Sequence, residues 1–367
     1  MNRQAFSLMM WLGGFCLQIH AQQVLSPNHL DTLIQQMMTQ AKVPGLSLAL
    51  LRPNQPISLK MYGLTKADSS QKVDVNTVFE AASLTKPIFA YAVLQLVEAG
   101  KIDLDKPLYQ YLPYADAAFD GRYKQITARL VLSHRSGFPN WRRNRQKPRV
   151  NMSFTPGERF GYSGEGFVYL QKVVEKITGM PINDWMEQQV LKPLKMNHSG
   201  FFWKADFESD FAFPHDDKKA IGQKYKPTQA NMAYSLHTTA ADYAIFLEAL
   251  LDSKGLNQAT LTEMLGPQTP LPKRFSGGEI VPQSFWGLGM GVEKLPEGTY
   301  LWHWGDNGDF KAFYMVNLTK KEGMVYFANG EKGLDFADEI TLHTVGGTHH
   351  AFSFLGINWQ EELKKQK

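Results

Sequence analysis

Two side chains of complementary chemistry, Ser83 and Lys86, stand three positions apart in the segment Ser83-Leu84-Thr85-Lys86. Three residues make nearly one helical turn, so on a helix the ammonium group projects from the same face as the hydroxyl and can reach it. A serine hydroxyl is a poor nucleophile near neutral pH, so a neighbouring group must accept its proton as it attacks a carbonyl. The pair therefore predicts nucleophilic catalysis at Ser83.

The segments around this pair favour a helix start at Ser83. The apolar residues 78–82 precede it, and a helical pattern follows as far as Gly100. A helix N-terminus supplies partial positive charge and free N–H groups, which an oxyanion needs. A structural alternative is that Ser83 only caps the helix and Lys86 is a solvated first-turn residue. The same spacing at Ser69 and Lys72 lies in a polar turn, and no role is assigned to it.

Two glycine-rich segments carry further polar side chains. Residues 157–164 place Tyr162 and Ser163 on a turn just before a predicted helix. Residues 302–308 place His303 at the end of a predicted strand beside glycines, where a backbone can approach a ligand closely. Both segments are expected to face the cleft that contains Ser83.

The elements that must position these residues form a mixed pattern. Helices are predicted over residues 28–41, 127–134, 165–178, 181–190, 238–251 and 334–344, and strands over 46–51, 57–62, 287–292, 299–303, 311–318 and 323–328. This order predicts an α/β protein of the α+β type, with an antiparallel sheet flanked by terminal helices and a large helical insertion. A single domain is expected over residues 22–367, with a sheet lobe (22–102 and 236–367), a helical lobe (103–235) and a cleft between them.

Composition narrows the function classes. The 367 residues are 43% hydrophobic and 20% charged, as in a folded globular protein, and the net charge of +4 is spread along the chain. Nucleic acid is therefore not an expected partner. The single cysteine, Cys16, excludes a disulfide framework within one chain. His349 and His350 lack a third ligand at suitable spacing, and neither a metal nor a cofactor is expected.

The first 21 residues are predicted to be a signal peptide. Arg3 precedes an apolar run over residues 5–19, and Ala21 ends a plausible cleavage site. The run is too short for a membrane span. Lipidation at Cys16 is disfavoured because Phe15 stands where a small residue is needed. We expect export to the periplasm or the medium; the alternative, a buried N-terminal helix, lacks a polar face.

Several ordered segments resemble the serine β-lactamase and penicillin-binding-protein superfamily, in its branch of class C β-lactamases, DD-peptidases and family VIII-type esterases. The matching segments are Ser83-Leu84-Thr85-Lys86, residues 130–139 (LVLSHRSGFP), residues 154–158 (FTPGE) leading to Tyr162, and His303-Trp304-Gly305. They span nearly the whole chain beyond residue 21. The resemblance implies a β-lactamase/transpeptidase-like fold and a small-molecule or peptidoglycan-related substrate.

The resemblance also implies a role for each matched residue. Ser83 would be the nucleophile, with Lys86 and Tyr162 as a coupled base whose tyrosinate Lys86 and a protonated His303 would stabilise. The backbone N–H groups of Ser83 and Asp306 would hold the oxyanion. Ser163 and Gly305 complete the residues expected to contact substrate. Water would then release the acyl group.

Two departures from the family pattern bear on the substrate. The family's Tyr-x-Asn element is Tyr162-Ser163-Gly164 here, and its Lys-Thr-Gly element is His303-Trp304-Gly305. Both favour an esterase or peptidase acting on small or D-amino-acid-containing acyl groups over an efficient β-lactamase. A class C-like β-lactamase or DD-carboxypeptidase is the first alternative, and a catalytically impaired protein that binds or senses penicillin-type ligands is the second.

Three other features receive more ordinary interpretations. His134 is predicted to cap the C-terminus of a helix, and the pair Tyr234-Ser235 is predicted to serve packing. Residues 141–149 hold the strongest cluster of basic residues, including Arg142 and Arg143. Such a run is usually a solvated loop, but it could instead line the cleft and attract an anionic substrate.

Overall fold

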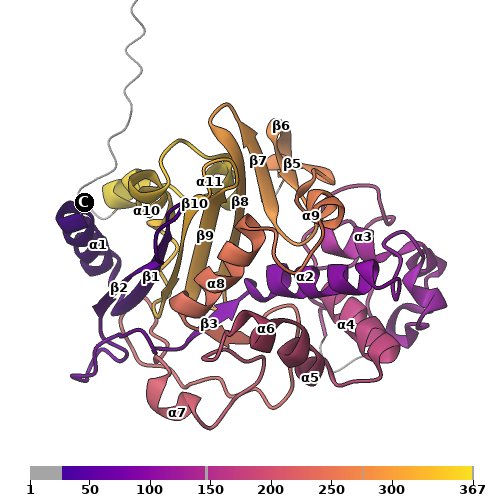
Figure 1. Cartoon of the computed structure of the whole chain (residues 1–367), viewed down its shortest axis with the longest axis horizontal. Coiled ribbons are helices and arrows are strands. Elements are labelled where there is room, and N and C mark those ends of the chain that lie inside the picture. Colours follow the sequence, from indigo (N-terminus) through magenta and orange to yellow (C-terminus); the bar gives the residue numbers. More distant parts are fainter. Residues whose placement is uncertain (1–26, 145–147, 276, 366–367) are drawn as a thin grey trace, which may run out of the picture.

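The computed structural model describes residues 27–144, 148–275 and 277–365. The predicted signal peptide, including Cys16, lies outside these described residues. An eight-stranded sheet in the order β2-β1-β10-β9-β8-β7-β6-β5 dominates one side of the molecule, and its neighbouring strands run antiparallel (Figure 1). The strands are β1 Gly45–Leu51, β2 Ser58–Gly63, β5 Thr269–Arg274, β6 Gly277–Trp286, β7 Gly291–Leu295, β8 Gly298–Asp306, β9 Lys311–Asn317 and β10 Glu322–Ala328. Two short strands, β3 Phe79–Ala82 and β4 Leu236–Thr238, pair separately.

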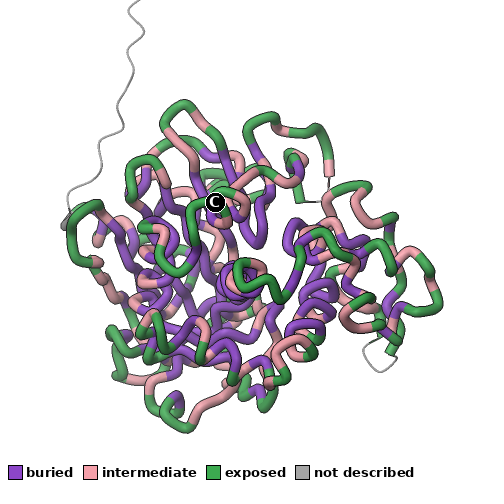
Figure 2. The backbone as a smooth tube through the Cα atoms, turned by 45° about the vertical axis from the view of Figure 1, so that its right-hand side comes forward, coloured by how far each residue is buried: buried purple, intermediate pink, exposed green. Residues whose placement is uncertain are grey.

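Helices cover both faces of the large sheet, which is why its central strands are buried along their whole length. Alternate residues of β1 point to opposite faces. Leu46 and Leu48 join a core with the helices α1 Pro27–Ala41, α10 Ala337–Thr344 and α11 His350–Leu355, whereas Ala49 joins the core that contains α8 Ala240–Leu251. Figure 2 shows this buried interior beneath an exposed outer shell.

A helical region lies beside the sheet and contains most of the chain between β3 and β4 (Figure 1). It holds α2 Thr85–Glu98, α3 Ala128–Leu132, α4 Gly164–Thr178, α5 Ile182–Met186, α6 Lys192–Leu194, α7 Phe207–Asp210 and the short turns η1 Leu108–Gln110, η2 Ala115–Ala117, η3 Gly121–Gln125 and η4 Glu187–Leu191. Two helices remain. α9 Gln258–Leu265 lies between α8 and β5, and α12 Trp359–Lys365 ends the described chain. Within the described chain, no helix combines the length and apolar character needed to cross a membrane.

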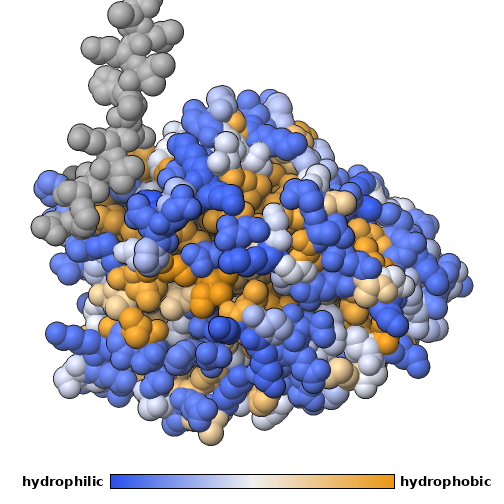
Figure 3. Space-filling model, in the orientation of Figure 1, coloured by the Kyte–Doolittle hydropathy of each residue, from blue (hydrophilic) through white to orange (hydrophobic). Residues whose placement is uncertain are grey.

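The outer surface agrees with this burial pattern. The face in Figure 3 is mainly hydrophilic, and its hydrophobic side chains gather toward the middle, where Figure 1 places α8. α8 is apolar over most of its twelve residues, so its inner face packs on β1 and β10 while part of its remaining surface stays visible.

The predicted fold class is confirmed, and the local differences have clear physical causes. The antiparallel β5–β6 hairpin was not predicted because β5 contains Pro270 and Pro272 and both strands are largely exposed, so they lack a regular apolar alternation. β7 begins at Gly291 instead of 287 because the chain first turns at Gly289, where φ is +95°. The helix predicted over residues 238–251 is confirmed as α8, with Thr239 as its N-cap: the Thr239 hydroxyl accepts a hydrogen bond from the Asp242 N–H.

Candidate active site

Ser83 lies in the turn that joins β3 to α2. The strand pairing of β3 with β4 shifts register between Glu80 and Ala82, and Ala82 has a φ of +49°. This conformation is costly for a residue with a side chain, so the surrounding structure must hold it. The Ser83 side chain does not cap α2, which begins with Leu84 at its N-cap position and no side-chain cap. The alternative in which Ser83 is only a cap is therefore wrong.

Lys86 reaches Ser83 from the first turn of α2. Its Nζ lies 3.0 Å from the Ser83 Oγ and donates a 2.7 Å hydrogen bond to the Ala233 carbonyl. The side chain is almost fully buried and forms no ion pair with a carboxylate of the described chain. Burial lowers the pKa of Lys86 to about 7. Near neutral pH, much of this amine is therefore uncharged and able to accept a proton from Ser83.

Tyr162 completes the polar centre from the turn before α4. Its ring centroid lies 4.8 Å from the Lys86 Nζ. Burial raises the pKa of Tyr162, and the nearby Ser83 hydroxyl offsets only part of this effect. The phenol is consequently the stable form, and it is Lys86, with its lowered pKa, that is poised to take the first proton. The two side chains meet as the sequence predicted.

His134 holds the turn that carries Tyr162. Its carbonyl accepts a hydrogen bond from the Gly161 N–H, and its Nδ1 accepts one of 3.0 Å from the Ser163 N–H. The imidazole lies 4.1 Å from the Tyr162 ring, measured between centroids. Burial lowers the pKa of His134 well below its usual value, so the ring is neutral. The predicted helix cap is confirmed: His134 follows the end of α3 in the left-handed region, with φ at +54°, and its N–H donates a hydrogen bond to the Val131 carbonyl, while its imidazole points to the neighbouring turn.

His303 does not provide the second cation that was expected. It is fully buried in β8, and burial, assisted by the nearby Lys86, lowers its pKa to about 3. Its Nδ1 lies 2.7 Å from the Trp304 carbonyl, which only accepts, so Nδ1 carries the proton and Nε2 is a free acceptor. A neutral imidazole cannot stabilise a tyrosinate by charge.

Three buried polar atoms around Tyr162 lack a hydrogen-bond partner among the described residues: the Tyr162 hydroxyl, the His134 Nε2 and the His303 Nε2. Their rings lie close together, with the His303 centroid 6.3 Å from that of Tyr162. Buried polar atoms are normally paired, and exceptions gather where a substrate or a water molecule binds. This cluster marks the place where a reacting group would enter.

The end of β8 lies against the strand that leads to Ser83. A Cβ at Gly305 would come within 2.4 Å of the Ala81 carbonyl oxygen, so only glycine permits this approach. Asp306 follows at the strand end, where its carboxylate pairs with the Lys311 Nζ at 2.6 Å. The close approach of Gly305 thus places the end of β8 against the strand that leads to Ser83, and the oxyanion role of the Asp306 N–H stays a prediction.

Ser163 and Gly164 differ from what the resemblance suggested. The Ser163 hydroxyl accepts from the Gly166 N–H and donates to the Pro139 carbonyl, so it caps α4 and is not open to a substrate. A Cβ at Gly164 would lie 2.7 Å from the Trp141 ring. Trp141 therefore occupies the space that an amide side chain would need, which explains physically why the family's asparagine is missing here.

The basic loop contributes less charge to the cleft than its sequence suggested. Arg142 forms a two-pronged ion pair with the buried Glu165, through bonds of 2.9 and 2.7 Å, and a further pair with Asp116 at 2.9 Å. These ion pairs fix the Arg142 side chain beside the start of α4. Arg143 is exposed, and Arg145 and Lys147 lie outside the described residues.

Two structural contributions were missed in the sequence. The Ala233 carbonyl orients Lys86, but a backbone atom leaves no signal in the residue pattern. Tyr234, predicted to serve packing, lines a cavity beside Glu80 and Asn307. Its ring contacts Trp141 at 5.6 Å between centroids. Neither contact could have been found without knowing which loops meet.

Comparison with known proteins places this geometry in a family. The family model described as Beta-lactamase matches residues 30–345. The chain belongs to the Beta-lactamase family. Its fold is similar to those of a class C β-lactamase (TM-score 0.75, 21% identity, 88% of this chain and 96% of that one) and of the D-alanine carboxypeptidase AmpC from Burkholderia cenocepacia (TM-score 0.74, 18% identity, 87% and 98%).

Two curated relatives match the chain at low sequence identity. Protein flp of Staphylococcus aureus is 22% identical over 334 residues, which cover 83% of this chain and 63% of that protein. Esterase EstB of Burkholderia gladioli is 28% identical over 215 residues, covering 51% of this chain and 54% of the esterase. The chain thus spans less than two thirds of the length of these curated relatives.

Proposed function

We propose that this member of the Beta-lactamase family is an exported serine hydrolase that cleaves ester or amide bonds through an acyl-enzyme on Ser83. The observation that carries the proposal is the buried Lys86, whose Nζ lies 3.0 Å from the Ser83 Oγ. An unpaired lysine in an apolar interior costs stability. Its position beside the Ser83 hydroxyl gives that cost a catalytic purpose.

The proposed reaction begins with proton transfer from the Ser83 Oγ to the neutral Lys86 Nζ as the oxygen attacks the substrate carbonyl. The backbone N–H groups of Ser83 and Asp306 hold the resulting oxyanion. Tyr162 then passes its proton to the leaving group, and the proton that Lys86 took from Ser83 restores the Tyr162 hydroxyl, so the two side chains act as a coupled pair. Water, deprotonated by the same pair, attacks the acyl group and regenerates the Ser83 hydroxyl.

Esters or amides of small acyl groups fit this site better than β-lactams do. A β-lactam antibiotic carries a carboxylate, and the neutral His303 offers it no charge. The space of the family's amide side chain is filled by Trp141. The similarity to esterase EstB supports this choice, whereas the similarity to a D-alanine carboxypeptidase keeps D-amino-acid-containing substrates as the second candidate.

Intact-mass measurements over a time course test the acyl-enzyme directly, with p-nitrophenyl acetate and benzylpenicillin as separate reagents. We expect an acetyl adduct and ester turnover on the wild type, and neither on Ser83→Ala. Tyr162→Phe should lose most of its turnover while still accepting an acyl group from an activated ester, whose leaving group needs no proton. Wild-type turnover by Ser83→Ala contradicts the proposal, and wild-type turnover of an unactivated ester by Tyr162→Phe removes the role of Tyr162.

Benzylpenicillin separates the alternatives. A long-lived penicilloyl adduct on the wild type indicates a penicillin-binding peptidase, and a transient adduct with consumption of the antibiotic indicates a β-lactamase. Ester turnover without any penicilloyl adduct is the result that we expect. Ligand binding without turnover of either reagent would indicate the impaired sensing protein instead.

A further inference from the structure

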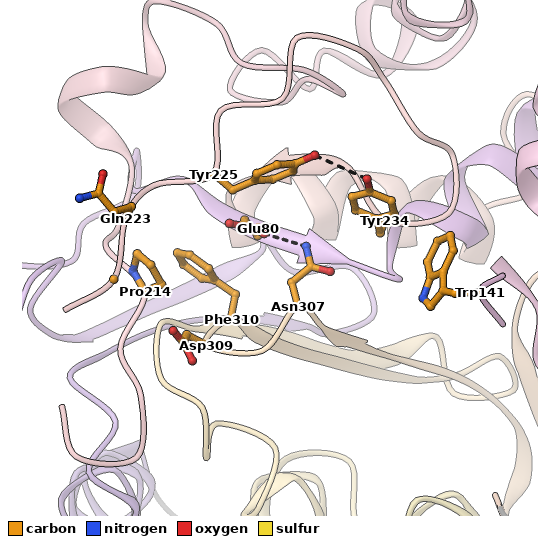
Figure 4. A pocket seen from close by; sticks show the side chains of 10 residues that line it. Glu80, Trp141, Pro214, Gln223, Tyr225, Tyr234, Asn307, Asp309 and Phe310 are labelled. Carbon is orange, nitrogen blue, oxygen red and sulfur yellow. Dashed lines mark hydrogen bonds between the residues drawn. The ribbon is translucent and has the colours of Figure 1, made fainter. Parts of the chain in front are cut away.

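A cavity of about 400 Å³ lies against β3, the strand that leads to Ser83, and its charge is the opposite of what the basic loop suggested (Figure 4). Glu80, on β3, stands three residues before Ser83, and Asn307 directly follows Asp306. The cavity is lined by Glu80, Trp141, Pro214, Gly222, Gln223, Tyr225, Tyr234, Asn307, Asp309 and Phe310. It therefore lies against both chain segments that contribute an N–H group to the proposed oxyanion site.

The position of Tyr162 indicates which part of a substrate this cavity receives. Tyr162 does not line it, but lines a different cavity of about 310 Å³ together with Phe138 and Phe160. A leaving group must meet the Tyr162 hydroxyl to be protonated, so it departs on the Tyr162 side. The cavity between Glu80 and Asp309 is then left for the acyl group.

The lining carries two carboxylates and no compensating base. Of its ten described residues, none is lysine, arginine or histidine. The Glu80 carboxylate is 6% exposed and accepts a 2.7 Å hydrogen bond from the Asn307 Nδ2. Asp309 is half-buried and has neither a hydrogen bond nor an ion pair with another described residue. Lys311, whose charge acts on Asp309, is itself paired with Asp306.

Aromatic side chains form the rest of the wall. Tyr225 and Tyr234 lie across the cavity from Asp309 and Phe310, with Trp141 at one end (Figure 4). Aromatic faces combined with carboxylates attract organic cations, through the ring quadrupole and through charge, and repel anions. Neutral alkyl groups gain only the apolar part of this interaction.

We propose that this cavity selects substrates whose acyl group carries a positively charged nitrogen, with Asp309 as the main determinant of that selectivity. The inference rests on the proposed function, because it assigns the substrate class of the Ser83 hydrolase. It replaces the alternative in which the basic loop attracts an anionic substrate, since Arg142 of that loop is already bound to Glu165 and Asp116.

Two isosteric esters test the charge alone: the p-nitrophenyl ester of 4-(trimethylammonio)butanoate and that of 5,5-dimethylhexanoate. They have the same shape and leaving group and differ only in a nitrogen cation against a carbon. We expect the wild type to show a kcat/KM about tenfold higher for the cationic ester. Asp309→Asn should bring this ratio close to one, and Asp309→Lys should reverse the preference.

Matched controls locate the effect. Asp184→Asn removes an exposed carboxylate of α5, outside this cavity, and should keep the wild-type ratio. A second pair of acetate esters places the same cation, or its tert-butyl isostere, on the phenol. The ratio for that pair should not change in Asp309→Asn, because the leaving group lies on the Tyr162 side. Thermal melting curves confirm that each variant is folded.

The outcomes distinguish this inference from the proposed function. Ser83-dependent hydrolysis at equal kcat/KM for the two acyl esters would defeat the inference and leave the hydrolase intact. A cationic preference that persists unchanged in both Asp309 variants would likewise overturn the assignment to Asp309. If neither ester is hydrolysed and Ser83 acquires no acyl adduct, the proposed function fails and the inference fails with it.

Discussion

Acylation of Ser83 should accelerate about tenfold between pH 6 and pH 8. Lys86 accepts the Ser83 proton only when it is uncharged, and its pKa lies at about 7 because it is buried. A group with this pKa is about one-tenth deprotonated at pH 6 and about nine-tenths at pH 8. The rate must therefore rise with pH across this window. A lysine with an ordinary pKa would give a rise that continues beyond pH 9.

The assay is kcat/KM for p-nitrophenyl acetate, which carries no titrating group itself, read at the wavelength where p-nitrophenol and its anion absorb equally. Ser83→Ala supplies the background. Burial also raises the pKa of Glu80 to about 7, so Glu80→Gln must be measured in parallel. The pKa values of His134 and His303 are lowered, His303 to about 3, so neither accounts for a midpoint near 7.

A midpoint near 7 that persists in Glu80→Gln supports Lys86 as the proton acceptor. If the rise disappears in Glu80→Gln, the titrating group is the glutamate, and the assignment to Lys86 is refuted. A rate that is flat or falls between pH 6 and pH 8 in both proteins would refute it as well, since a protonated lysine would then be the active form.

Three further predictions concern stability and geometry. Lys86→Met should abolish turnover yet stabilise the protein at pH 7 by about 2 kcal/mol in chemical denaturation. Between pH 7 and 10.5 the lysine binds a proton more readily in the unfolded chain than in the folded one, so its burial costs up to about 4 to 5 kcal/mol of stability. The variant recovers this cost but loses the hydrogen bonds of Lys86, which reduces the gain. This gain should shrink as the pH rises toward 10. Gly305→Ala should lower kcat about 10²-fold with a smaller change in KM, because its Cβ would push β8 away from the Ala81 carbonyl; wild-type steady-state kinetics would contradict that close packing. Glu293→Ala should cost about 3 kcal/mol of unfolding free energy, because it leaves His349 buried without its 2.9 Å partner, and an unchanged melting temperature would show that the pair is dispensable.

The lysine that makes the chemistry possible is also a liability to the fold. Lys86 has hydrogen bonds to Ser83 and to the Ala233 carbonyl but no carboxylate partner in the described chain. A carboxylate would stabilise its charged form, raise its pKa and remove its ability to accept a proton. Lys86 can therefore serve as the proposed base because it has no ion pair, and the folded protein is less stable as a result.

Local sequence patterns predicted much of the fold. The helix over residues 165–178 was predicted from the helical spacing of its apolar positions and from Gly179 as its end; the structure has it as Gly164–Thr178, with Gly179 left-handed at a φ of +69°. The strands β1, β9 and β10 were predicted because they are short apolar runs between turns. These signals depend on neighbours in the chain, so a single sequence contains them. The β5–β6 hairpin has no such pattern, because its two strands are held by pairing with each other and not by burial of an apolar face.

For the site, the sequence by itself determined which groups are proposed to react: Ser83 and Lys86 are spaced by nearly one helical turn, and this spacing alone brings their side chains together. Only the tertiary structure decided their chemical state. Burial among residues distant in the chain lowers the pKa of Lys86, keeps His303 neutral and turns His134 toward the Tyr162 loop. A pKa depends on desolvation and on every charge nearby in space. Neither is encoded in a local pattern of residue types, so the direction of proton transfer and the charge of the cavity emerged only when the chain was folded.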